Sequence, residues 1–279
     1  TQVFSNMATI IIVSSIIAPM MTIFAAKGFN VSVIPAFILQ GGMSAIATAG
    51  GSGFAAMMLA QPSFKGDGAA WAMKKGSIML LMLVATAAYT WSLYTPENPG
   101  AVMPWLLVGG IGGFIVALVP VFKKTWAPVT APLYAALEGL FLGAISAMFE
   151  ASYPGIVMQA VMLTMGVLAA LLMAYKSGLI KATENFKLGI VAATGGIALL
   201  YLVNIGMRLS GFDGMGFIHE SSLMGIAFSG FVVVIAALNL VLDFDFIETG
   251  VEQGAPKHME WYAAFGLLVT LIWLYLEML

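Results

Sequence analysis

Seven apolar stretches, each long enough to cross a lipid bilayer, dominate the sequence from residue 76 to its end. They cover residues 76–94, 102–122, 129–149, 155–175, 188–207, 222–242 and 261–279. A membrane-spanning helix needs about 20 predominantly apolar residues. The breaks between the stretches are short and rich in Pro and Gly, as at residues 95–100 and 153–155, and such clusters are typical of turns. The sequence therefore predicts an all-α polytopic membrane protein, a seven-helix bundle without a β-sheet.

The composition excludes a water-soluble fold and several kinds of site. Only 9% of the 279 residues are charged and 61% are hydrophobic, whereas a soluble globular protein carries roughly 25% charged residues. The formal net charge of −2 gives no reason to expect nucleic-acid binding, and the absence of Cys excludes disulfides and thiolate metal sites. No nucleotide-binding loop or hydrolase motif is present. We therefore expect neither an enzyme nor a permanently bound cofactor.

Basic residues predict the orientation of the seven-helix unit in the membrane. Every second break between the apolar stretches is basic, and Lys and Arg are enriched in cytoplasmic loops. The opposite breaks are acidic, with Arg208 as their one basic residue. We therefore expect the N-terminus of the unit to be cytoplasmic, with cytoplasmic loops at 123–126, 176–187 and 248–260. The lysines on this side are Lys65, Lys74, Lys75, Lys123, Lys124, Lys176, Lys181, Lys187 and Lys257.

Residues 1–63 form a separate N-terminal extension, and residues 64–279 hold the seven-helix domain. The extension is apolar and rich in Gly, with Gly50, Gly51 and Gly53 close together. One interpretation is a membrane-embedded helical hairpin at the periphery of the bundle; the other is one span followed by an interfacial or re-entrant segment. Because small residues permit close helix packing, we expect the hairpin to offer a docking surface for another membrane protein.

Four acidic residues lie within the apolar stretches or at their edges: Glu138, Asp243, Asp245 and Glu277. Placing a charged side chain at the centre of a bilayer costs about 2.5–3.5 kcal/mol, so intramembrane acids are candidate functional residues. Asn239 and Asp243 are four residues apart and share a helix face, whereas Asp243 and Asp245 point in roughly opposite directions. This spacing favours Asp243 as the acid that faces the bundle interior. The alternative is that both aspartates mark the cytoplasmic end of their helix.

Glu277 and Glu138 each allow two interpretations. A helix that starts at Met259 places Glu277 about 27 Å from its start, too far to touch Asp243; the two acids meet only if the helix starts near Leu267. Glu138 lies near the middle of the stretch 129–149. It is either part of an ion or proton site, or a protonated acid that hydrogen-bonds to a neighbouring helix.

Five segments together resemble a known family. From about residue 66 to residue 279 the chain is similar to the bacterial branch of the Bax inhibitor-1 family, the YccA-like or transmembrane Bax inhibitor motif proteins. The segments that carry the resemblance are 123–128 (KKTWAP), 137–143 (LEGLFLG), 175–178 (YKSG), 237–247 (ALNLVLDFDFI) and 254–266 (GAPKHMEWYAAFG).

This resemblance implies a bundle with a central seventh helix and a pH-sensitive cation leak, chiefly for calcium, controlled by an acid pair on helices six and seven. By motif the pair falls on Asp243 and Glu277, where the family pattern Leu-Tyr-Leu-Asp has the shorter acid. Lys123 is the nearest candidate for the basic residue that closes the site from helix two. The second apolar stretch holds no acid, and Glu138 is the candidate substitute for the family's acid there.

Two functions follow from the resemblance. In the first, Asp243 and Glu277 share a proton at about 2.5–3.0 Å, and its loss opens a path for a transiently bound cation such as Ca²⁺. In the second, the protein is a non-transporting adaptor in the bacterial inner membrane. It then binds another membrane protein, or a protease complex such as FtsH, through residues 1–63.

Overall fold

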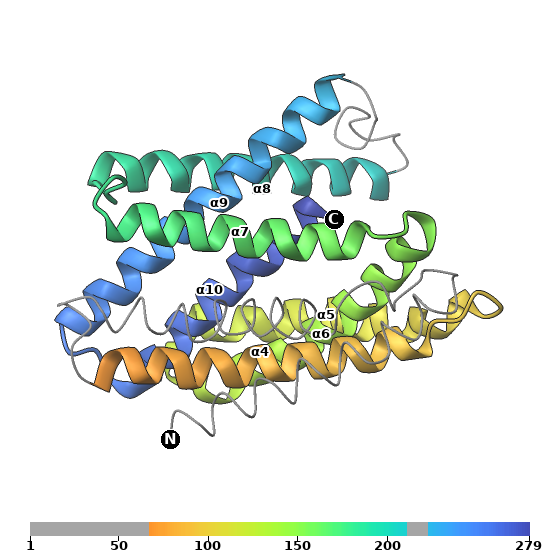
Figure 1. Cartoon of the computed structure of the whole chain (residues 1–279), viewed down its shortest axis with the longest axis horizontal. Coiled ribbons are helices and arrows are strands. Elements are labelled where there is room, and N and C mark those ends of the chain that lie inside the picture. The colour runs from red at the N-terminus through yellow and green to blue at the C-terminus, as the bar shows by residue number, and fades with distance from the viewer. Residues whose placement is uncertain (1–66, 211–222) are drawn as a thin grey trace, which may run out of the picture. The chain divides into compact units, whose positions relative to one another are not determined.

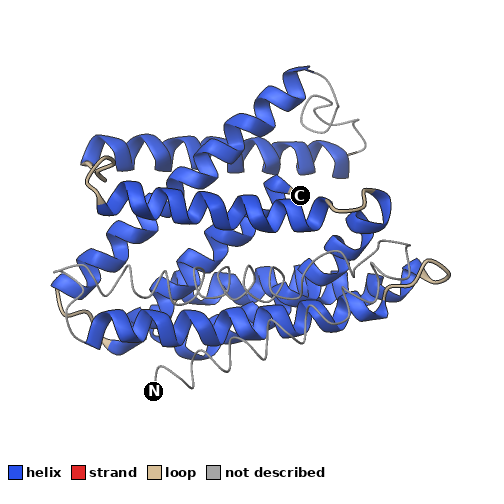
Figure 2. Ribbon diagram, viewed as in Figure 1, coloured by secondary structure: helices blue, strands red, loops and turns tan. Residues whose placement is uncertain are grey.

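The computed structural model describes residues 67–210 and 223–279, and the predictions for residues 1–63 lie outside this range. All regular structure in the described part is helical (Figure 2). Two 3₁₀ turns accompany the α-helices, η4 (Pro99–Val102) and η5 (Lys124–Trp126). The α-helices are α4 (Asp67–Leu93), α5 (Met103–Phe122), α6 (Ala127–Ser152), α7 (Ile156–Lys176), α8 (Glu184–Leu209), α9 (Leu223–Glu252) and α10 (Lys257–Met278).

The helices confirm the predicted fold class, an all-α polytopic membrane protein. Each of the seven predicted stretches corresponds to one α-helix of the described chain. The largest shifts are at the start of α4, which begins at Asp67, and at the end of α9, which reaches Glu252. Six of these helices are long and apolar enough to cross a membrane by length and composition: α4, α5, α6, α7, α9 and α10. The seventh, α8, has 26 residues and contains the predicted span 188–207.

The predicted loop at 248–260 is wrong, because α9 continues ten residues beyond the end of its apolar stretch. Only residues 253–256 separate α9 from α10. The acidic residues at 243, 245 and 248 do not end the helix, since they lie on it. The helix ends instead next to Gly254, whose φ of 62° is in the left-handed region, and Pro256 follows. Gly and then Pro just beyond the last turn are the usual way to end a helix.

The described helices belong to two compact units. The first contains α4, α5, most of α6 and the start of α10 up to Ala264. The second contains the end of α6, then α7, α8 and α9, and the part of α10 from Phe265 onward.

Glycines bring the helices of the first unit close together. A Cβ added to Gly109 of α5 would lie 2.5 Å from the backbone nitrogen of Phe141 on α6. Cβ atoms added to Gly139 and Gly143 of α6 would collide with the backbone of α4. Small residues between helices allow backbones to approach closely, which is how membrane helices gain packing energy where lipid supplies no hydrophobic driving force.

The second unit is organised around α9. This helix packs against both α7 and α8, and Figure 1 shows it crossing them obliquely. It meets α8 in an apolar cluster of Ile190 and Ile197 from α8 with Val232 and Ile235 from α9. At its start, α7 is capped by the Glu150 carboxylate, which accepts hydrogen bonds from the backbone nitrogens of Gly155 (2.7 Å) and Val157 (3.2 Å). A negative charge at a helix N-terminus is stabilising.

We expect Gly143→Ala to destabilise the protein by about 1–3 kcal/mol, because the new methyl group overpacks the interface between α4 and α6. The measurement is thermal or denaturant unfolding in detergent. Gly166→Ala on α7 is the matched control, since nothing lies within 4 Å of a Cβ at that position. The control should be neutral or stabilising by up to about 1 kcal/mol. Equal effects of the two substitutions would contradict the close α4–α6 packing.

Candidate functional site around α9

The polar side chains of α9 reach three different neighbouring helices of the second unit. Asn239, Asp243, Asp245 and Glu248 all lie within its last four turns. At 1.5 Å per residue, α9 is about 45 Å long, which exceeds the roughly 30 Å thickness of the hydrocarbon core. The helix therefore carries its acids from the apolar region toward one membrane surface.

Asp243 faces α10 with one buried and unsatisfied oxygen. Its Oδ2 atom is buried and has no hydrogen-bond partner among the residues that the structure describes. The carboxyl lies against Gly266, where an added Cβ would sit 3.4 Å from Oδ1, and beside Thr270. The Thr270 side chain hydrogen-bonds to the Asp243 carboxyl, and its hydroxyl also lies 3.2 Å from the Gly266 carbonyl. This contact leaves Oδ2 without a partner among the described residues. An ionised carboxylate in this position is costly unless a proton, a cation or water compensates it.

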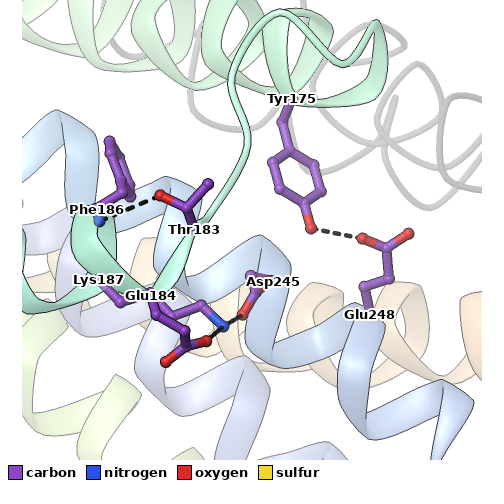
Figure 3. Close-up of polar contacts among 7 residues, drawn as sticks. All are labelled: Tyr175, Thr183, Glu184, Phe186, Lys187, Asp245 and Glu248. Carbon is purple, nitrogen blue, oxygen red and sulfur yellow. Dashed lines mark hydrogen bonds and ion pairs between the residues drawn. The ribbon is translucent and has the colours of Figure 1, made fainter.

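Asp245 points to α8 and forms an ion pair there. Its Oδ2 lies 2.8 Å from Lys187 Nζ, which also lies 3.3 Å from Glu184 (Figure 3). Lys187 precedes the apolar part of α8, and its hydrogen bond to Asp245 raises the pKa of the lysine. Asp245 is thus more than a marker of the helix end, because it ties α9 to α8.

Glu248 and Asn239 tie α9 to its other neighbours. The Tyr175 hydroxyl of α7 donates to Glu248 at 2.5 Å (Figure 3), and the Tyr175 ring packs against Phe244. Asn239 donates through Nδ2 to Thr194 Oγ1 of α8 and to the Ile235 carbonyl of α9, both at 2.8 Å. These polar groups have partners, which leaves the Asp243 oxygen as the exception on this helix.

Glu277 forms a separate site near the end of α10. Its Oε1 accepts hydrogen bonds from the Tyr201 hydroxyl of α8 and from Trp273 Nε1, both at 3.2 Å. Tyr201 also stacks edge-on against Phe228 of α9. The Tyr201 bond therefore links α10 to α8, while the Trp273 bond lies within α10.

The expected direct pair between Asp243 and Glu277 is wrong. Glu277 is bound by Tyr201 and Trp273, while Asp243 faces Gly266 and Thr270. Glu277 lies seven residues beyond Thr270 on α10, which corresponds to about 10 Å along the helix axis. The reason is where the helix starts. Because α10 begins at Lys257 and not near Leu267, Glu277 lies too far along the helix to touch Asp243.

Glu138 belongs to the first unit, and its carboxyl packs against α5 at Gly113, which has no side chain. A Cβ added to Gly113 of α5 would sit 2.9 Å from its Oε1. Its carboxyl also hydrogen-bonds to the Tyr134 side chain, one turn earlier on α6. Lys123, in the same unit, lies over the Trp126 ring at 4.7 Å.

Sequence reasoning identified the acids of this site but missed their partners. Thr270, Tyr201 and Tyr175 carry no charge and lie on other helices than the acids that they contact, so only their positions opposite an acid make them functional candidates. Trp273 lies on α10 with Glu277, four residues before it, and this spacing places the two side chains on one helix face. Among the described residues, no group of three or more His, Cys, Asp or Glu is placed to hold a metal ion.

Comparison with known proteins gives one match. Residues 70–279 match the sequence model of the family described as Bax inhibitor 1 like. No curated protein and no solved structure matches the chain.

We expect Asp243→Asn and Glu277→Gln to change the free energy of unfolding independently. Effects at sites more than about 7–10 Å apart usually add within about 0.5 kcal/mol, whereas groups that touch couple more strongly. The measurement is a double-mutant cycle in detergent. A second cycle on Tyr175→Phe and Glu248→Gln, whose side chains lie 2.5 Å apart, should show a larger coupling. A strong coupling between Asp243 and Glu277 would restore the shared-proton pair.

Proposed function

The chain belongs to the Bax inhibitor 1 like family, and we propose that it is a pH-sensitive cation leak in which the Asp243 carboxyl binds the proton and the passing cation. The observation that carries the proposal is the buried Asp243 Oδ2, which has no hydrogen-bond partner among the described residues. Placing an ionisable group inside the membrane costs free energy, so such a group is a functional candidate by default.

The surroundings of Asp243 suit transient rather than permanent cation binding. A hard cation such as Ca²⁺ takes six to eight oxygen ligands, and the groups next to the Asp243 carboxyl are the Thr270 hydroxyl and the backbone at Gly266. Water must supply the remaining ligands. Conduction requires binding that is weak enough for the ion to leave, so an incomplete oxygen shell is compatible with a leak for which Ca²⁺ is the substrate.

Protonation of Asp243 controls the leak in this proposal. The neutral acid can donate a hydrogen bond to a nearby oxygen and packs against Gly266 without a charge to compensate. The ionised acid supplies the negative charge that attracts a cation. The flux is therefore expected to be low at acid pH and to increase as pH rises. The activity is transport rather than catalysis, and the proposed location is a bacterial inner membrane.

Glu277 and the acids near the end of α9 have structural roles in this proposal. Their oxygens accept hydrogen bonds or ion pairs from Tyr201, Trp273, Lys187 and Tyr175. Removing them should weaken helix packing without removing the group that binds the proton. This difference separates the proposed site from its neighbours.

We expect Asp243→Asn to abolish the pH dependence of Ca²⁺ flux into liposomes that contain the purified protein. The amide keeps the shape of the side chain but cannot ionise at any pH used in the assay. Glu277→Gln is the matched control, and its flux should retain the pH response of the unmodified protein. A full pH response in Asp243→Asn would refute the role of this residue. Absence of any flux in the unmodified protein, at every pH, would favour the adaptor function.

A further inference from the structure

Six basic and aromatic side chains of the first unit form three lysine–aromatic pairs, which we together call the basic–aromatic cluster. Lys75 Nζ of α4 lies 4.7 Å from the centre of the Trp261 ring on α10. Lys124 Nζ lies 5.2 Å from the ring centre of Tyr262, the next residue on α10. Lys123 Nζ, beside Lys124, lies 4.7 Å from the ring centre of Trp126. The three pairs are neighbours along the chain, because Lys123 and Lys124 are consecutive residues, as are Trp261 and Tyr262.

No carboxylate of the described residues occupies the ammonium groups of this cluster. None of the three lysines forms an ion pair with a carboxylate among the described residues, and neighbouring Glu260 does not pair with them either. An aromatic face attracts a cation electrostatically but does not accept conventional hydrogen bonds as an oxygen does. The three N–H groups of each ammonium can therefore still donate to oxygen atoms of a ligand. Lys123 and Lys124 are exposed, and Trp126 is 53% exposed.

The three lysines of the cluster stand at the ends of candidate membrane spans, which begin at Lys75 and Lys124 and end at Phe122. Lys123 and Lys124 follow the last residue of α5, and Trp261 and Tyr262 lie in the second turn of α10. Trp and Tyr are enriched at the membrane–water interface, and Lys extends its charged end toward the interface. Phosphate oxygens of lipid headgroups occupy the same layer.

We propose that the basic–aromatic cluster binds the headgroup of an anionic phospholipid in the leaflet that it faces. The three ammonium groups are complementary to the phosphate, and the exposed Trp126 ring offers an apolar surface to the adjoining glycerol and acyl carbons. Basic groups next to membrane helices attract anionic lipids. The site joins α4, the α5–α6 connection and α10, so a bound lipid should also stabilise the first unit. This proposal is independent of the proposed leak.

The test is the binding of phosphatidylglycerol to the purified full chain, measured by native mass spectrometry and by thermal stabilisation in detergent. Phosphatidylcholine and inorganic phosphate are the comparison ligands. We expect phosphatidylglycerol to bind and stabilise, and the other two to have little effect. Equal stabilisation by phosphatidylcholine, or by inorganic phosphate without a lipid chain, would overturn the proposal.

Lysine variants locate the site. A lysine near an anionic surface contributes roughly fivefold to binding, so Lys75→Gln, Lys123→Gln and Lys124→Gln combined should weaken it on the order of 100-fold. Lys124→Gln is compared with Lys181→Gln, since Lys181 is an exposed lysine in the α7–α8 connection, outside the cluster. Lys124→Gln should weaken binding about fivefold, and Lys181→Gln should not. Equal effects would mean general electrostatic attraction and would overturn the site. If the triple variant does not fold, the single variants decide the question.

Discussion

A polar side chain on a membrane helix must find its partner within the protein, on its own helix or on a neighbouring one, because lipid offers none. This constraint organises the second unit around α9. Asp245 pairs with Lys187 of α8, Glu248 accepts from Tyr175 of α7, and Asn239 donates to Thr194 of α8. Each interaction replaces water with a specific group, so each also sets the rotation of α9 about its axis. Asp243 is consequently turned toward α10, where Gly266 leaves room for it.

Asp243 differs from the other acids because its buried Oδ2 atom has no hydrogen-bond partner among the described residues. A buried carboxylate oxygen without such a partner is costly. Asn239, Asp245 and Glu248 on the same helix are paired. The acid of the first unit is accommodated differently. Glu138 packs against Gly113 of α5 and hydrogen-bonds to the Tyr134 side chain. Packing by small residues and pairing of polar groups are the two means by which these helices associate in the absence of a hydrophobic driving force between them.

Much of the fold was predictable from the sequence, because apolar length alone predicts membrane helices. The errors fall where a helix end had to be inferred from polarity. The apolar stretch at 222–242 ends at its first acid, yet α9 runs to Glu252. The acids in the part of α9 beyond residue 242 have partners on other helices: Lys187 pairs with Asp245, and Tyr175 donates to Glu248. No local pattern reveals partners so distant in the sequence.

The sequence by itself determined the membrane class, the approximate limits of the seven helices and the identity of the candidate acids, since these depend on composition and local periodicity. The tertiary structure decided which acids are paired. It separated Asp243 from Glu277 because α10 starts at Lys257 and carries Glu277 about 10 Å beyond Thr270 along its axis. It also placed Lys75 over the Trp261 ring and Lys124 over the Tyr262 ring. The register between two packed helices depends on side chains of both, so neither helix's sequence could supply it alone.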